Sequence, residues 1–293
     1  MENLGRITWS LLASIHRLAL WCIFSCLPAR TISRNGLRYE VRYNDALDRH
    51  LLNAGEGGDY SKVIKMIARL QENRITAIDV GANAGYWTLP LAKEFDYVIA
   101  VEPDPFVFRK LERNIALNPL IMSRITLIQA AAGDSAGFVP LTIRRSIDGD
   151  ALLNRGLSST VTFGRKVMSV PMVQIDQMKI TELQKVSLIK IDVEGSEFGV
   201  LSGATAIITR DKPLVFWEAA LSIDRKFCHR NVERCLNLLN SLGYSHYYFT
   251  TDDKPINFCE VSDLDTRGID CDIISVLKGS EVDLKVMQLI LEP

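Results

Sequence analysis

The sequence predicts an α/β fold in which helices cover both faces of a mainly parallel sheet. Three observations support this prediction: short apolar runs rich in β-branched residues recur along the chain, stretches of helical length separate them, and several runs end in a carboxylate. Strands that alternate with helices at this spacing form βαβ units, whose strands are parallel. The 293 residues are enough for one large domain of this kind.

The chain begins with a mostly apolar segment, residues 1–29, that we expect to form a helix. His16 and Arg17 interrupt it, and its uninterrupted part, 18–27, is about half as long as a membrane-spanning helix. One interpretation is a helix that lies on a membrane surface through residues 7–28, where its aromatic rings suit the interface. Packing on the chain's own domain or on a second subunit is the alternative.

Residues 30–74 form a predicted N-terminal extension. Apolar and polar residues alternate over 37–43, which indicates a strand or hairpin half covered by the core. The apolar residues of 61–70 fall on one helical face, which is typical of an amphipathic helix that packs on a domain.

Residues 75–293 form the predicted main domain. Its strands are predicted at 75–80, 97–101, 125–128, 186–191 and 214–217. Helices are predicted from the turn after the first strand to about residue 95, at 105–117 and at 196–207. An insertion at about 139–176 separates the third strand from the fourth, and a connection of this length is usually functional or disordered.

Composition excludes some classes of function. The formal net charge of −1 argues against a strongly basic nucleic-acid surface. The six cysteines include no Cys-x-x-Cys pair and no histidine cluster at zinc spacing, so no resident metal is predicted. Scattered thiols of this kind are typical of a cytoplasmic protein, which would be peripheral at the inner face of a membrane if the apolar segment binds lipid.

Four of the predicted strands end in a carboxylate: Asp79, Glu102, Asp192 and Glu218. In doubly wound sheets the ligand binds beyond the carboxyl ends of the strands, where the strand order switches. A single acid there is often only the cap of the following helix. Because four such acids are difficult to explain as caps, we expect them to converge on one crevice.

The turn after the first predicted strand reads Asp79-x-Gly81-x-x-x-Gly85 and contains Asn83. Its glycines would let the backbone approach a ligand closely. Asp79 is placed to accept hydrogen bonds from a cationic amino-acid group. Glu102 is placed to accept both hydroxyls of a ribose, a position shared by NAD and adenosyl ligands.

The spacing of these glycines favours an adenosyl ligand over a dinucleotide. The dinucleotide fingerprint is Gly-x-Gly-x-x-Gly, whereas this turn lacks the third glycine and has an acid, Asp79, where a pyrophosphate would be repelled. An acid there suits the ammonium and sulfonium end of S-adenosylmethionine. An NAD(P)-dependent oxidoreductase and a non-catalytic binding module on the same fold are the alternatives.

Taken together, these segments resemble the FkbM-type methyltransferases over roughly residues 60–219. The segments that carry the resemblance are 77–85, 101–103, 189–197 and 213–218. The Asp-Val-Glu-Gly-x-Glu motif is the most specific of them. The resemblance implies a class I methyltransferase with a Rossmann-like sheet that uses S-adenosylmethionine. It also implies O-methylation of a hydroxyl on a natural product, a sugar or a glycolipid, so the partner would be a small-molecule, glycan or lipid-linked acceptor.

Roles for the remaining candidate residues follow from this resemblance. Ala131 and Asp134 lie where adenine usually contacts such folds. Asp192 would lie near the methionine part of the donor and Glu194 near the acceptor, while Glu218, at the end of a buried strand, is the candidate general base. The three acids could alternatively hold a divalent cation, an arrangement that we do not favour.

The insertion contains the candidate acceptor loop, because loops on rigid scaffolds often determine specificity. Its polar residues are Arg155, Ser158, Ser159 and Thr160. A solvated hairpin is the alternative. The chain has no Pro-Pro-aromatic platform after the fourth strand, which argues against a base or amide nitrogen as the acceptor.

Overall fold

The computed structural model describes residues 28–43, 45–53, 60–144, 151–153, 165–179, 184–219, 225–250, 257–260 and 271–291. Nearly all of the predicted N-terminal helix and the four candidate acceptor residues at 155 and 158–160 lie outside the described residues. No helix among the described residues is both long and apolar enough to cross a membrane.

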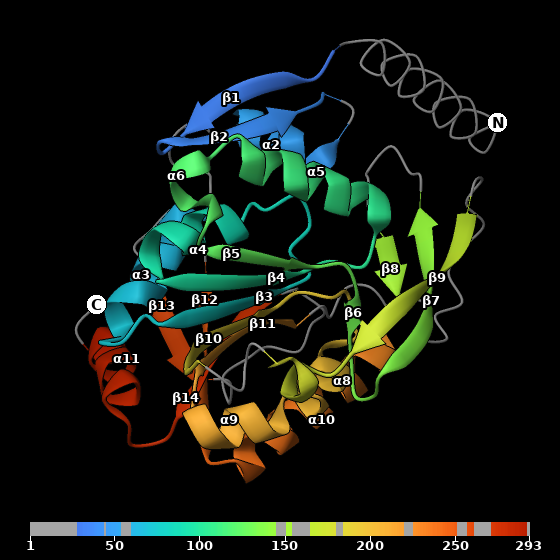
Figure 1. Cartoon of the computed structure of the whole chain (residues 1–293). Helices are drawn as coiled ribbons and strands as arrows, with labels where there is room; N and C mark the ends of the chain where they lie inside the picture. The colour runs from blue at the N-terminus through green and yellow to red at the C-terminus, as the bar shows by residue number, and fades with distance from the viewer. Residues whose placement is uncertain are drawn as a thin grey trace, which may run out of the picture.

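The described residues contain an eight-stranded sheet with the order β13-β12-β14-β11-β10-β3-β4-β5 (Figure 1). Its parallel strands confirm the five predicted ones: β3 (Thr76–Val80), β4 (Tyr97–Val101), β5 (Ile125–Ile128), β10 (Val186–Ile191) and β11 (Leu214–Ala219). Three antiparallel strands that we did not predict extend the sheet beyond β11: β12 (Tyr244–Thr250), β13 (Asn257–Glu260) and β14 (Cys271–Leu277). The strand order switches between the parallel neighbours β3 and β10: β4 and β5 continue the sheet on one side, and β11 continues it on the other. Doubly wound folds bind their ligands at such a switch point.

Helices cover both faces of this sheet, as predicted (Figure 1). One face packs against α3 (Ser61–Leu70), α4 (Thr88–Glu94), α5 (Pro105–Ala116) and α11 (Glu281–Leu291). The other face packs against α8 (Glu197–Ser202), α9 (Thr205–Asp211) and α10 (Arg225–Ser241). Every residue of β3 and β10 is buried, which is why these strands have almost continuous apolar sequences.

The helix predicted at 196–207 is wrong, because the chain forms two short helices there, α8 and α9, broken at Gly203. A Cβ at Gly203 would lie 1.9 Å from the carbonyl oxygen of Gly133, so two turns of the backbone pack directly against each other. Asp176 then caps α9 by accepting hydrogen bonds from the N–H groups of Ala206 and Ile207, both at 2.9 Å. Tertiary contacts with the insertion therefore set this helix boundary.

The described part of the insertion, with the residues just before it, forms a second sheet, of order β6-β9-β7-β8, where the sequence predicted an acceptor loop or, alternatively, a solvated hairpin. Its strands are β6 (Ala131–Ala132), β7 (Gly137–Arg144), β8 (Ala151–Leu153) and β9 (Arg165–Val173), and the short helix η2 (Ile175–Gln177) follows them. Val139, Leu141 and Val170 point inward and form a small apolar cluster with Ala131. This cluster explains how a segment with few core residues forms an ordered sheet.

The N-terminal extension contains the predicted hairpin, β1 (Arg30–Arg34) paired with β2 (Leu37–Val41). Its turn, Asn35-Gly36, has φ angles of 49° and 77°, the left-handed pair that tight hairpins require. The inward residues of β2 are buried against α4 and α5. The helix α2 (Ala46–Asn53) follows, and α3 confirms the predicted amphipathic helix; the short α6 (Pro119–Met122) completes this side.

Candidate functional site

A cavity of about 250 Å³ lies at the carboxyl ends of the parallel strands. Its walls come from the turn after β3, from the ends of β4, β10 and β11, and from β7 of the second sheet. Leu47 and Tyr60 of the N-terminal extension also line it. The sequence predicted neither residue, because apolar and aromatic residues in helical segments are most often part of the core.

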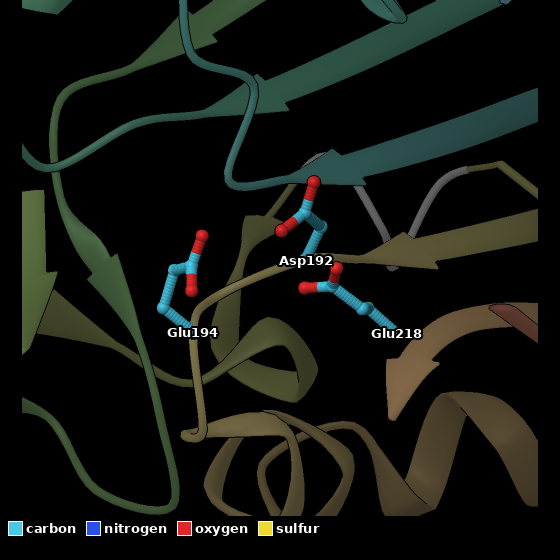
Figure 2. Close-up of side chains that lie close together, drawn as sticks. All are labelled: Asp192, Glu194 and Glu218. Atoms are coloured by element: carbon cyan, nitrogen blue, oxygen red, sulfur yellow. The ribbon is translucent and has the colours of Figure 1, made fainter. Parts of the chain in front are cut away.

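Three of the four strand-end acids line this cavity, namely Glu102, Asp192 and Glu218, and Glu194 joins them. Figure 2 shows the carboxylates of Asp192, Glu194 and Glu218 turned toward one another at the strand tips, with one oxygen from each within 4.8 Å of the others. Glu194 has a φ of 53°, a left-handed conformation that bends the chain there. The predicted convergence of acids on one crevice holds for these residues.

Asp79 does not line the cavity, so the expected contact with a cationic ligand group is not what the geometry favours. Its carboxylate is fully buried, lies 3.2 Å from the Nζ of Lys190 and accepts a hydrogen bond from the hydroxyl of Thr88 at 2.7 Å. The charge of Asp79 is therefore neutralised inside the protein, and the negative field in the cavity comes from the other acids.

Lys190 is a further residue of the cavity to which the sequence analysis gave no role. Only 2% of it is exposed, and its Nζ lies 3.4 Å from Asp192 and donates to the carbonyl oxygen of Gly81 at 3.1 Å. Burial disfavours the ammonium, but Asp79 and then Asp192 outweigh it and raise the pKa of Lys190 above its ordinary value. A lysine inside an apolar strand, in register with an acid on the next strand, was the signal that could have revealed this pair.

The two glycines of the turn have packing roles that differ from the predicted approach to a ligand. A Cβ at Gly81, whose φ is 78°, would lie 1.8 Å from the carbonyl oxygen of Asp192. A Cβ at Gly85, whose φ is 90°, would lie 2.8 Å from the side chain of Leu111 on α5. Gly81 and Asn83 line the cavity, whereas Gly85 does not. The glycines allow the turn to pack tightly, and their contact with a ligand stays a prediction.

The backbone amides of the first five residues of this turn, 81–85, are engaged inside the protein. The N–H groups of Gly81 and Ala82 donate to the carbonyl oxygen of Val101, and that of Gly85 donates to Ala82. Those of Asn83 and Ala84 donate to side chains, to Glu102 at 2.9 Å and to the Asn83 oxygen at 2.7 Å. A pyrophosphate at a helix N-terminus needs free N–H groups. The amides of residues 81–85 are therefore not available to a pyrophosphate.

Glu102 is held rigidly at the tip of β4 with 7% of its surface exposed. Its two oxygens accept hydrogen bonds from the backbone N–H groups of Asn83, at 2.9 Å, and Asp104, at 2.8 Å. Burial raises the pKa of Glu102 to about 7, against the lowering effect of these hydrogen bonds. The carboxylate keeps lone pairs that face the cavity, so it suits the hydroxyls of a ribose.

Ala131 and Asp134 do not reach the cavity. Ala131 is buried in the cluster of the second sheet, and Asp134 is exposed. Leu141 of β7 and Val107 of α5 line the cavity and supply apolar surface there. The predicted adenine contacts of Ala131 and Asp134 therefore stay predictions that the lining of this cavity does not support.

Two acids on the neighbouring strands β11 and β14 have raised pKa values. Burial and then the charges of Asp192 and Glu194 raise the pKa of Glu218 to about 9. Asp272, which the sequence analysis did not identify, pairs with Glu218 across β11 and β14, and burial followed by Asp192 raises its pKa to about 6. Asp192, Glu194 and Glu218 together have the oxygen donors of a divalent-cation site, which stays an unfavoured prediction.

We expect Glu218→Gln to flatten the pH dependence of stability between about pH 7 and 9. A carboxyl whose pKa is raised by folding, here from 4.5 to about 9, contributes stability that is fully present below pH 4.5 and is lost as the pH rises through 9. The variant carries no such proton. Urea unfolding at pH 5, 7 and 9 measures this, with the exposed Glu233→Gln as control; equal slopes in wild type and Glu218→Gln would contradict the assignment.

Residues 79–245 match a sequence family described as the methyltransferase FkbM domain. The chain is 27% identical over 164 residues to methyltransferase sdnD of Sordaria araneosa, a match that covers 47% of this chain and 62% of the relative. It is 25% identical over 143 residues to methyltransferase 1 of Beauveria bassiana (strain ARSEF 2860), covering 43% and 57% respectively. The matches span about three fifths of the length of these relatives.

Two similar solved structures have low identity. The methyltransferase FkbM from Methylobacillus flagellatus KT is 20% identical, with a TM-score of 0.44, and the match covers 68% of this chain and 43% of that one. The O-methyltransferase from Bacillus cereus, solved with SAH, is 14% identical, with a TM-score of 0.43, and the match covers 74% and 80%. The fold assignment above rests on the strand order and on the helices that cover the sheet.

Proposed function

The chain belongs to the FkbM methyltransferase family, and from this premise we propose that it transfers a methyl group from S-adenosylmethionine to a hydroxyl oxygen. The acceptor class that we propose is a small molecule, a sugar or a lipid-linked glycan. The observation that carries the proposal is the charge of the cavity. Four carboxylates face it, and the one lysine that lines it is already paired with Asp79 and Asp192.

The residues of the cavity fit an adenosyl sulfonium donor. Glu102 would accept the hydroxyls of the ribose, and Val107 and Leu141 would lie against the adenine ring. The acids at the ends of β10 and β11 would face the ammonium and the sulfonium. Asp79 would act indirectly, because it holds the Lys190 ammonium that in turn lies next to Asp192.

The chemistry asks little of the protein beyond alignment and acceptance of a proton. The donor supplies a methyl group that the sulfonium already activates. The chain's own residues must align the acceptor hydroxyl, exclude water and take the hydroxyl proton. Glu218 is the proposed base: its pKa of about 9 leaves it protonated in the free protein at neutral pH. The positive charge of the bound sulfonium would favour release of that proton to water, and the carboxylate that is left could accept the hydroxyl proton.

The carboxylates of the cavity also support two narrower parts of the proposal, namely that the acceptor atom is an oxygen and that the partner is not a nucleic acid. The turn at 192–195 supplies carboxylates where a nitrogen methyltransferase would need a planar platform. A polyanion would be repelled by the acidic cavity and by a chain whose net charge is −1. A cytoplasmic location and peripheral membrane contact through residues 7–28 stay predictions.

Ligand binding tests the proposal. S-adenosylhomocysteine at 100 times its Kd should stabilise the folded protein by about 2.7 kcal/mol and raise its Tm, whereas NAD should not. A shift with NAD alone would favour the oxidoreductase, and no shift with either ligand would refute the proposal. Incubation with methyl-labelled donor and a panel of hydroxylated acceptors then separates an enzyme from a non-catalytic binding module, which would bind the donor product without transferring label.

A further inference from the structure

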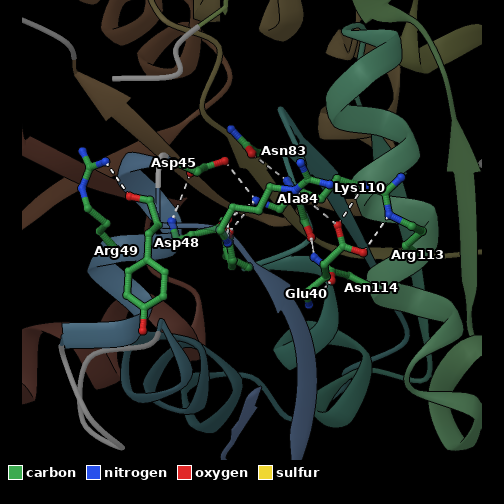
Figure 3. Close-up of polar contacts among 12 residues, drawn as sticks. Glu40, Asp45, Asp48, Arg49, Asn83, Ala84, Lys110, Arg113 and Asn114 are labelled. Atoms are coloured by element: carbon green, nitrogen blue, oxygen red, sulfur yellow. Dashed lines mark hydrogen bonds and ion pairs between the residues drawn. The ribbon is translucent and has the colours of Figure 1, made fainter. Parts of the chain in front are cut away.

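A buried charged network joins the N-terminal extension to α5. The Nζ of Lys110 lies 2.6 Å from a carboxylate oxygen of Asp48 and 3.0 Å from one of Asp45 (Figure 3). The Asp48 side chain is fully buried, and it also accepts a hydrogen bond from the N–H of Arg42 at 2.7 Å. Such a pair stabilises a fold little compared with apolar packing, but it fixes one geometry when all its partners are present.

Tyr86 connects this network to the cavity. Its ring lines the cavity, directly after Gly85 in the turn that follows β3. Its hydroxyl donates a hydrogen bond to Asp48 and lies 3.3 Å from the Nζ of Lys110. The position of one cavity wall is therefore set by residues that do not reach the cavity themselves.

The extension contributes a second wall through the same contacts. Leu47, the neighbour of Asp48 in α2, lines the cavity. One turn further along α5, Asn114 donates to the carbonyl oxygen of Ala84 in the turn, at 2.7 Å, and accepts from the N–H of Glu40 in β2, at 2.7 Å (Figure 3). The extension precedes the family match, which begins at residue 79. Through Asn114 it nevertheless makes hydrogen-bonded contact with the turn, which lies within that match.

We propose that Asp48 and Lys110 are positioning residues of the donor cavity, which hold the ring of Tyr86 and the helix that carries Leu47 in the binding geometry. This inference rests on the proposed function, because it takes the cavity as the donor site. The inference means that packing of α2 against α5 and the turn raises the affinity for the donor. Because such coupling is reciprocal, donor binding must also stabilise that packing.

A double-mutant cycle on the shared hydrogen bond tests the linkage. Asp48→Asn and Tyr86→Phe should each weaken binding of S-adenosylhomocysteine about tenfold in calorimetry, and the double variant should lose little more, because both changes break the same contact. The matched control is Asn118→Ala. It removes the two hydrogen bonds between Asn118, just after α5, and Arg38 of β2, at 2.8 and 2.9 Å, and the one to the carbonyl oxygen of Asn114, at 2.8 Å, without touching Asp48 or Tyr86.

The control should lower Tm yet bind S-adenosylhomocysteine within about twofold of wild type. Unchanged affinity in Asp48→Asn and Tyr86→Phe, additive losses in the double variant, or an equal loss in Asn118→Ala would overturn the inference. If wild type itself fails to bind, the proposed function fails instead, and this result is distinct from those three.

Hydrogen exchange supplies a readout that needs no ligand. In the free protein, Asp48→Asn should speed amide exchange over residues 81–87 more than Asn118→Ala does, since only the former releases the Tyr86 hydroxyl. Bound S-adenosylhomocysteine should in turn slow exchange over residues 45–53 in wild type and have less effect in Asp48→Asn. Equal exchange over 81–87 in the two variants would contradict the positioning role even where no ligand binds.

Discussion

Replacing Glu218 with glutamine should lower methyl transfer about 10²–10⁴-fold, the usual contribution of a general base, while the protein still binds S-adenosylhomocysteine. Glutamine keeps the size of the side chain and removes its ability to take a proton. Glu218 is the best-placed base because it faces the cavity beside Asp192 and Glu194, whose charges help to raise its pKa to about 9.

The measurement is transfer of labelled methyl to whichever hydroxylated acceptor wild type modifies, together with calorimetry for donor-product binding. Glu233→Gln, an exposed change on α10, is the control and should leave both quantities unchanged. Because the sulfonium is a cation, donor binding should also release a proton from wild type, and less from Glu218→Gln. Turnover of Glu218→Gln within about threefold of wild type would remove Glu218 as the base.

Glu102→Ala should weaken binding of S-adenosylhomocysteine by at least about 100-fold. Hydrogen bonds to a charged group contribute about 1.5–3 kcal/mol each, and two ribose hydroxyls would use this carboxylate. Alanine also leaves the N–H groups of Asn83 and Asp104 without their acceptor, which loosens the turn. Glu102→Gln keeps one acceptor oxygen in place and should therefore lose less affinity than Glu102→Ala.

Probes that carry parts of the donor separate the ribose contact from a general effect on the turn. Adenosine, which has the ribose, should lose affinity for Glu102→Gln, whereas methionine should not. In wild type the affinity for adenosine should fall as the pH drops below about 7, because protonation of Glu102 weakens it as an acceptor. Full adenosine affinity in Glu102→Gln, with an unchanged Tm, would show that this residue does not bind the ribose.

Local patterns predicted the elements whose periodicity is visible in a short window. The parallel strands are continuous apolar runs because both of their faces are buried, and α5 begins at Pro105 behind its cap, Asp104. The three antiparallel strands β12, β13 and β14 escaped prediction. One reason is that polar and aromatic residues such as His246 and Tyr247 interrupt their apolar pattern.

In the candidate site, too, the sequence predicted the acids at the strand ends but not the residues that pair with them. Sequence reasoning identified Glu102, Asp192 and Glu218, because the carboxyl ends of parallel strands meet at one edge of the sheet. It did not identify the partner of Asp79, which lies outside the cavity and whose charge is cancelled by Lys190 on the neighbouring strand. It also missed Leu47 and Tyr60, since nothing local marks an apolar or aromatic side chain as part of a cavity wall.

The sequence by itself determined the parallel sheet, the family and the row of carboxylates at its edge, because each is encoded in a contiguous stretch of residues. Only the tertiary structure decided which of those carboxylates line the cavity and that Gly203 breaks a helix. It also decided that Asp48 forms a hydrogen bond with Tyr86, 38 positions along the chain. These outcomes depend on close contacts between residues far apart in the chain. Such contacts exist only once the strands have taken their order in the sheet.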